Sequence, residues 1–379
     1  MFPSDKGEGG NVTRDRTDRG GDEGTLVRHR SLGRRPVYPS LSSLSLSLSS
    51  LSSVSPWSSL SSLSSSSGAL CPAISTLGLQ LKNLELFHHF TTITYETVAS
   101  GSELPELWRL VVPRTAFSYE YVMHELLAVS ALHLSFLRPW DESYAMIAAE
   151  HHDKALESLK TALPAESPQH ATALYAASSL VALYEYACPP AVEGIKAPMW
   201  IPLFRGIWLI ARRHWEWVRH GELGRMLSFK LVGPGHYPGE DTEFPSSLYA
   251  LSQRDAPGQL DPEELEDDEV LQVYCHATEM LRLWWDRSWL TEYRVAAAFG
   301  WPVNIQDEFV DFIQEERPRA LVLLAHHCAQ MESIRDHFWW TKGRGADEIE
   351  RIEGILEDKW KHWLDWPKMR CIPKAREYT

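Results

Sequence analysis

The sequence is poor in cysteine, and the few cysteines that it has lie far apart. Only five occur in 379 residues, and no two of them form a CxxC pair. An odd number of scattered cysteines is a poor disulfide framework, which favours a reducing intracellular compartment. No apolar run approaches the ~20 residues of a membrane span, and the N-terminus lacks the apolar stretch of a secretory signal. The sequence therefore predicts neither a membrane span nor a disulfide-bonded secreted protein.

Positive charge is also scarce. Lysine and arginine number 37 against 51 aspartates and glutamates, which gives a net charge of −14 and a pI near 5.6. Binding to a phosphate backbone needs a clustered basic face, so the excess of acidic residues argues against nucleic-acid binding by the bulk of the chain. A separate nucleic-acid module fused elsewhere is not excluded.

Complete catalytic motifs are missing. His124 and Glu125 begin a zinc-protease pattern, but Ala128 stands where the second histidine is required. The acidic run 267–271 lacks the acid in fifth position that a diphosphate-binding magnesium motif needs. There is no GxSxG and no phosphate-binding GxxxxGK[ST]. The sequence predicts no catalytic residue and no cofactor; an all-α enzyme with catalytic groups from distant helices is the weakest alternative.

Two pairs of adjacent histidines might suggest a metal site, but helix geometry disfavours it. His88 and His89 are neighbours in the string LELFHHFTTITY, and His326 and His327 are neighbours further on. Adjacent residues of a helix point about 100° apart, so such a pair does not share one ion. We predict no metal site, and expect one of His88 and His89 to face the core and the other its rim.

Two parts of different character follow from composition. Residues 1–77, with a Ser/Leu-rich tract at 40–68, are predicted to be a disordered, low-complexity tail. Residues 78–370 show apolar side chains at helical spacing and predict an all-α domain. The Gly/Pro-rich stretch 231–262 is expected to form a long surface loop. The acids of 261–269 fit the start of a solvated helix, and a functional role of this acidic run is the less favoured alternative. Helices are predicted over 81–98, 118–137, 142–162, 168–187, 200–220, 268–291, 318–339 and 346–364.

What the sequence does have is aromatic residues, with 16 tryptophans. Such residues pack well in a core, and they also line apolar cavities between helices. Core packing is the favoured interpretation for any single tryptophan, and the pattern alone does not separate the two.

Several strings resemble the C-terminal regulatory domain of fungal zinc binuclear-cluster transcription factors. They are LELFHHFTTITY at 84–95, residues 107–134, WIPLFRG at 200–206 and residues 301–328. The sterol uptake control proteins are the group that they resemble most. The resemblance covers about 80–370, and it departs from the family where Arg344 and Gly345 follow Gly343 in place of a tryptophan.

The resemblance implies an all-α, multi-helix orthogonal domain that dimerises with itself or a related factor. It implies a sterol or another apolar ligand in a cavity, control of transcription by RNA polymerase II, and a nuclear location with exchange to the cytoplasm. DNA contact in the family comes from six cysteines holding zinc, and no cysteine precedes Cys71, so DNA binding is assigned to no residue here. A stand-alone interaction protein without DNA binding is the alternative. The aromatic candidates for the cavity are Phe87, Trp108, Phe117, Trp200, Phe204 and Trp301.

Overall fold

The computed structural model describes residues 72–101, 103–164, 167–188, 200–227, 244–288, 294–332, 334 and 338–372, and within these ranges the only regular elements are helices. None of these helices is long and apolar enough to cross a membrane. The α-helices are α2 (Pro72–Thr92), α3 (Leu104–Glu106), α4 (Val112–Ala116), α5 (Glu120–Leu137), α6 (Ser143–Ala162), α7 (Pro168–Ala187), α8 (Trp200–Arg213), α9 (Trp215–His220), α10 (Asp268–Ser288), α11 (Arg294–Asn304), α12 (Asp307–Gln314), α13 (Pro318–Glu332), α14 (Arg344–Ile355), α15 (Asp358–Lys361) and α16 (Asp365–Cys371).

Short helical turns of other types join them. One is π-helical, η3 (Leu107–Val111), and it leads directly into α4, where Pro113 has no N–H to donate to the preceding turn. The remaining turns are 3₁₀-helical: η2 (Thr94–Thr97), η4 (Glu222–Leu227), η6 (Ser246–Ser252), η7 (Pro262–Leu265), η9 (Trp339–Thr341) and η10 (His362–Leu364).

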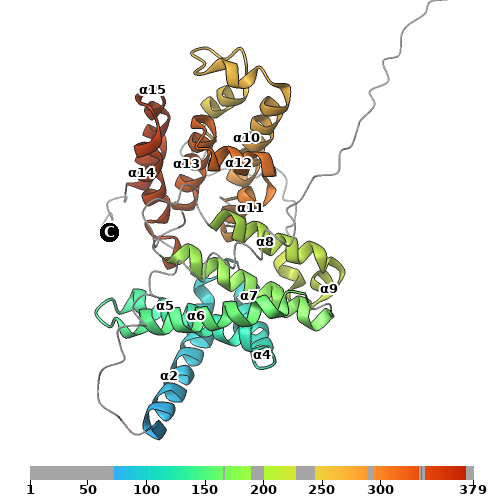
Figure 1. The fold of residues 1–379 in the computed structure, drawn as a ribbon, viewed down its shortest axis with the longest axis vertical. Helices are drawn as coiled ribbons and strands as arrows, with labels where there is room; N and C mark the ends of the chain where they lie inside the picture. The colour runs from blue at the N-terminus through green and yellow to red at the C-terminus, as the bar shows by residue number, and fades with distance from the viewer. Residues whose placement is uncertain are drawn as a thin grey trace, which may run out of the picture. The chain divides into compact units, whose positions relative to one another are not determined.

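A first hydrophobic core lies among α2, α5, α6, α7 and α8. α5 and α6 pack along one another, and α7 and α2 both contact α5 (Figure 1). α7 is apolar on almost every side, and most of its residues are buried. Ser167 caps its first turn, because its hydroxyl accepts a hydrogen bond from the His170 amide at 3.2 Å. Trp340, from far along the chain, also joins this core.

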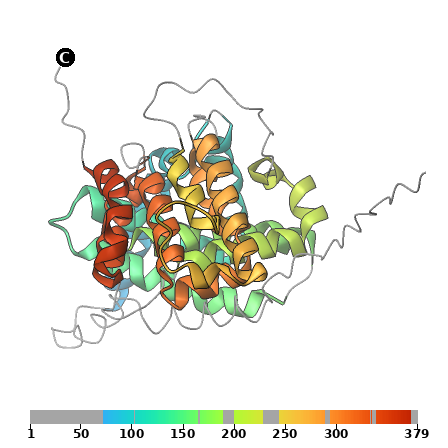
Figure 2. The ribbon, with the colours of Figure 1, turned by 90° about the horizontal axis from the view of Figure 1, so that it is seen from above.

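A second core is built from α10 to α16. α13 is buried along its whole length and contacts α10, α12, α14 and α16, and α10 and α13 run side by side in both views (Figures 1 and 2). α13 and α14 approach closely because Gly345 has no side chain: a Cβ at this position would lie 2.3 Å from the Cys328 carbonyl oxygen. Gly345 thus gives a packing reason for the departure from the family pattern after Gly343.

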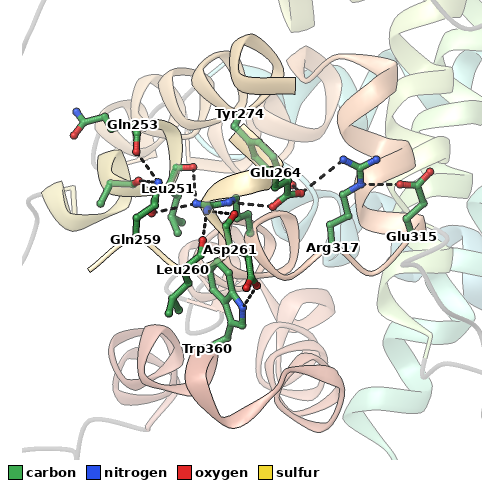
Figure 3. A network of polar contacts seen from close by, with 12 residues as sticks. Leu251, Gln253, Gln259, Leu260, Asp261, Glu264, Tyr274, Glu315, Arg317 and Trp360 are labelled. Carbon is green, nitrogen blue, oxygen red and sulfur yellow. Dashed lines mark hydrogen bonds and ion pairs between the residues drawn. The ribbon is translucent and has the colours of Figure 1, made fainter. Parts of the chain in front are cut away.

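One buried arginine fixes the segment that precedes α10 to the second core. Arg319 of α13 is fully buried and donates hydrogen bonds to the Glu264 carboxylate at 3.0 Å and to the backbone oxygens of Leu251, Leu260 and Asp261 (Figure 3). The Trp360 indole donates to the Asp261 carboxylate at 3.1 Å. The guanidinium thus supplies hydrogen-bond donors to carbonyl oxygens of the segment 251–261.

The predicted surface loop over 231–262 is wrong for its second half. Residues 246–252 form η6, whose Leu248 and Leu251 are buried in the second core. Residues 231–243 of that prediction lie outside the described residues. The predicted helix over 168–187 is confirmed, whereas the predicted helix 200–220 is interrupted at His214. α2 begins at Pro72, six residues before the predicted start of the domain at 78, and most of the predicted tail lies outside the described residues.

Candidate functional site

A cavity of about 290 Å³ is lined mostly by residues of the first core or packed against it, and by Trp284 of the second core. Its wall draws on segments from residue 98 to residue 340, so it exists only in the assembled fold. Most of the lining side chains are apolar. They are Val98, Ala99, Ser100, Leu104, Trp108, Tyr175, Ser179, Leu183, Phe204, Ile207, Trp208, Arg225, Met226, Leu227, Trp284, Val295, Phe299, Gly300, Val303, Asn304 and Trp340.

Stacked aromatic rings form one side of this wall. Phe204 of α8 stacks on Phe299 of α11 with ring centroids 3.9 Å apart, and Phe299 stacks on Trp340 at 5.4 Å. Tyr186 packs edge-on against all three rings from behind. Offset stacked and edge-to-face pairs are the favoured aromatic geometries, so this side of the cavity is rigid as well as apolar.

A missing side chain allows another part of the wall to close. A Cβ built on Gly300 would lie 2.1 Å from the ring of Trp284, a distance that no real contact shows. α10 and α11 therefore meet through glycine on one side and an indole ring on the other. Any larger residue at position 300 would displace Trp284, which itself lines the cavity.

Two tryptophan N–H groups hold the residues that enter the cavity from the N-terminal side. Trp340 donates to the Thr97 carbonyl at 2.8 Å, and Trp339 donates to the Thr97 hydroxyl at 2.9 Å. The next residues along the chain, Val98 and Ala99, are buried and lie in the wall. The two bonds thereby fix the position of this part of the wall.

The charged and exposed side of the cavity lies at η4. Arg225 lines the cavity and is exposed, and its guanidinium pairs with the Glu103 carboxylate at 3.3 Å. A second surface ion pair joins Glu222 of η4 to Arg114 of α4. Asn304 is also exposed at the wall. These polar side chains mark the mouth, whereas the interior is apolar.

Comparison with known proteins gives this cavity a family context. Residues 85–216 match the model of the fungal specific transcription factor domain. The chain is 27% identical over 315 residues to a Zn(2)-C6 fungal-type transcription factor of Gibberella zeae, covering 76% of this chain and 62% of that protein. Over residues 85–216 the chain is therefore similar to this domain.

Two further relatives agree with this assignment. The Zn(2)-C6 fungal-type transcription factor afumD of Aspergillus fumigatus is 27% identical over 255 residues, which is 64% of this chain and 66% of that protein. Sterol uptake control protein 2 of Saccharomyces cerevisiae is 36% identical over 110 residues, which is 28% of this chain and 12% of that protein. The chain thus spans a little under two thirds of the length of the first two relatives. All are named as regulators and not as enzymes, in keeping with the expectation that this chain is not an enzyme.

Of the six aromatic candidates, two line the cavity. These are Trp108, from the π-helical turn η3, and Phe204. Phe87 and Phe117 lie elsewhere and contact each other at 5.3 Å, with Phe117 73% exposed. Sequence alone does not reveal this, because a phenylalanine inside an apolar string looks the same whether its helix face is buried or exposed.

The other two candidates are in packed parts of the domain. Trp301 is fully buried in the second core and donates its indole N–H to the Ala277 carbonyl at 2.9 Å. Trp200 packs against Tyr186 and against His327. The lining residues that sequence analysis missed include Tyr175, Trp284, Phe299 and Trp340. Trp284 and Trp340 each stand beside a second tryptophan in the sequence, and this clustering of aromatic residues is the sequence feature that could have indicated them.

The paired histidines serve packing. His88 is exposed and His89 is buried, which confirms the expected division. His89 lies against the ring of His133, which accepts from or donates to the Thr94 hydroxyl at 3.0 Å and stacks on Trp339. Burial lowers the pKa of His133 to about 3, so it is neutral. Among the described residues, no group of three or more histidine, cysteine and acidic side chains is arranged to hold a metal ion.

A buried ionic cluster joins α5, α6 and α7 away from the cavity. Nδ1 of His152 lies 3.0 Å from both carboxylate oxygens of Glu125, and Nε2 lies 2.8 Å from Glu185. Burial by itself lowers the pKa of His152, but the Glu125 and Glu185 carboxylates outweigh it and raise the pKa to about 10. The imidazole is therefore charged at neutral pH. It stacks on the Tyr184 ring at 4.0 Å and links the three helices α5, α6 and α7.

Proposed function

We propose that this domain is the ligand-responsive part of a fungal regulator of transcription by RNA polymerase II, and that its cavity holds an apolar ligand of the sterol class. The observation that carries the proposal is the apolar cavity itself, which is lined by residues of the first core and by Trp284 of the second, in a chain whose residues 85–216 match the fungal specific transcription factor domain. Its volume of about 290 Å³ lies at the lower edge of the ~300–1,000 Å³ of small-molecule sites.

The names of the relatives support the ligand class and the regulatory role. One relative is named for the control of sterol uptake, and two are named as Zn(2)-C6 transcription factors. We propose a nuclear location with exchange to the cytoplasm on the same ground. DNA contact would come from a zinc-cluster module, to which none of the described residues is assigned.

The architecture supplies a route from ligand to regulation. The wall takes Leu183 and Phe204 from the first core, and Trp284 from the second. A ligand that contacts both cores binds the closed arrangement better than any arrangement in which they separate, and it shifts the population by that difference in affinity. Ligand binding would also stabilise the fold by mass action.

The direct test is saturable binding of tritiated cholesterol to the full chain. Val303 of α11 and Val310 of α12 are both half-buried valines, and only Val303 lines the cavity. We expect Val303→Phe to fill part of the cavity and weaken binding by at least about tenfold, or ~1.4 kcal/mol, with Val310→Phe unchanged. If the wild-type chain showed no saturable binding at micromolar cholesterol, the ligand part of the proposal would be abandoned.

A second candidate function is that of a dimerising interaction protein, and exposed apolar side chains favour it. Leu81 and Leu84 of α2 are 59% and 64% exposed, and Phe117 is 73% exposed. Large apolar residues that stay exposed are typical of contact surfaces when they gather on one face. A second copy or a related factor would cover them. Light scattering should show a dimer that Leu84→Asp weakens and that the control Leu283→Asp, on α10, leaves intact.

A further inference from the structure

Two buried polar groups in the cavity wall have no partner within the described residues. The hydroxyl of Tyr175 and the indole N–H of Trp108 form no hydrogen bond there, although the two side chains are only 6% and 4% exposed. Trp340, in the same wall, does donate its N–H, to the Thr97 carbonyl. Buried donors are almost always satisfied, so two unsatisfied donors in one wall require an explanation.

Both groups face open space. The hydroxyls of Tyr121 and Tyr184 also lack a partner, but they are sealed among packed atoms, and the Tyr175 hydroxyl and the Trp108 N–H are not. Since the two residues are otherwise buried and both line the cavity, the space that these polar atoms reach is the cavity. Tyr175 comes from α7 and Trp108 from η3, so the two donors enter from different segments.

The electrostatic surroundings limit what these donors can bind. Loss of water through burial is the cause that raises the pKa of Tyr175, and no neighbouring charge contributes. Arg225 is the charged lining residue, and it lies exposed at the mouth in an ion pair with Glu103. A carboxylate placed beside Tyr175 would lose its hydration without gaining a counter-charge, which is very unfavourable. An uncharged oxygen is therefore the better acceptor for the Tyr175 hydroxyl.

We infer that Tyr175 and Trp108 are specificity-determining residues that donate hydrogen bonds to an uncharged oxygen of an otherwise apolar ligand. This inference rests on the proposed ligand-binding function and narrows it. The ligand carries a hydroxyl or ketone oxygen that lies against Tyr175 and Trp108, and its hydrocarbon part contacts the apolar side chains of the wall. A sterol satisfies this requirement because its hydroxyl and its hydrocarbon tail are at opposite ends. A fatty acid would bind poorly with its carboxylate at these two donors, because neither carries a positive charge.

The test compares ligands that differ in one oxygen, on the full chain and two variants. Tyr175→Phe removes one hydroxyl, and Trp108→Phe removes the N–H. Tyr121→Phe is the matched control, since Tyr121 is a buried tyrosine whose unpartnered hydroxyl lies away from the cavity. Dissociation constants are measured for tritiated cholesterol, and cholest-5-ene, which lacks the hydroxyl, and oleic acid are measured as competitors. Thermal unfolding verifies that each variant is folded.

We expect Tyr175→Phe and Trp108→Phe each to weaken cholesterol binding by roughly two- to tenfold, the effect of one hydrogen bond. Binding of cholest-5-ene, weaker in the wild type, should be unchanged by Tyr175→Phe, and Tyr121→Phe should change neither. Equal binding of cholesterol and cholest-5-ene by the wild type, or an unchanged affinity in both variants, would overturn the inference while leaving the cavity as a sterol site. Preferential binding of oleic acid would overturn the inference that the two donors bind an uncharged oxygen. Failure of the wild type to bind either sterol would reject the proposed function as well.

Discussion

Replacing Arg319 with methionine tests whether one guanidinium holds the segment 251–264 against α13. The side chain is fully buried and donates to the Glu264 carboxylate and to three backbone oxygens, at distances of 3.0 Å for Glu264, 3.2 Å for Leu251 and 3.1 Å for Asp261. Methionine fills a similar volume and donates nothing, so packing is nearly kept while every one of these bonds is lost.

The expected loss follows from the groups that remain. Removing one partner of a buried charge pair costs about 3–5 kcal/mol, and each buried acceptor left without a donor costs about 1–3 kcal/mol. Glu264 keeps the Tyr274 hydroxyl at 2.5 Å and Arg317 at 3.7 Å, which offsets part of this loss. We therefore expect a decrease of about 4–6 kcal/mol in the free energy of unfolding, a large share of the ~5–15 kcal/mol typical of domains.

Urea denaturation followed by circular dichroism measures this decrease. Arg282→Met is the control, because Arg282 is half-exposed and its carboxylate contacts are 4.0 Å and 3.9 Å long; it should cost under about 1 kcal/mol. Arg319→Lys should fall between the two, since an ammonium keeps the charge and loses the planar fork of donors. A decrease for Arg319→Met no larger than that for Arg282→Met would refute the role given to the guanidinium.

Three further predictions concern protonation and close packing. The pKa of His152 is raised to about 10 from an unfolded value near 6.5, so the stabilisation that its charge gives is complete below pH 6.5 and is lost as the pH rises to 10. The difference in the free energy of unfolding between the wild type and His152→Gln should fall by up to ~1.4 kcal/mol per pH unit in that window. Gly300→Ala should displace Trp284, cost about 1–3 kcal/mol and weaken cholesterol binding measurably. Gly345→Ala meets the Cys328 carbonyl 2.3 Å away, so urea denaturation should show a similar loss of stability, with cholesterol affinity unchanged once the protein is folded.

The helices were predictable where a long periodic pattern is bounded by clear signals. α7 lies between prolines and is apolar on almost every side, and its predicted ends are correct. η6 was not predictable from composition, because its Ser- and Pro-rich surroundings are typical of surface loops. The spacing of Leu248 and Leu251 is the one local sign of burial there, and the hydrogen bonds from Arg319 that make it possible come from a residue 68 positions away in the sequence.

The cavity was less accessible to sequence analysis than the helices. Trp108 and Trp301 both sit in apolar strings, yet one lines the cavity and the other fills the second core. Tyr175 lies on a helix that is buried on nearly all sides, so no periodic pattern sets it apart. Which aromatic ring borders empty space depends on how separate helices meet, as with Trp284 against Gly300, and that is a property of the assembled fold.

The bonds from Trp339 and Trp340 to Thr97 also set an order for the synthesis of this chain. The two partners of the longer-range bond are 243 residues apart. At ~5–20 residues per second, a ribosome needs roughly 12–50 seconds to pass from one to the other. During that interval the nascent first core lacks Trp340, and the wall that it completes is still open. The proposed ligand would therefore meet a complete wall only after the C-terminal third has been made, and we expect it to act on chains in which both cores have been synthesised.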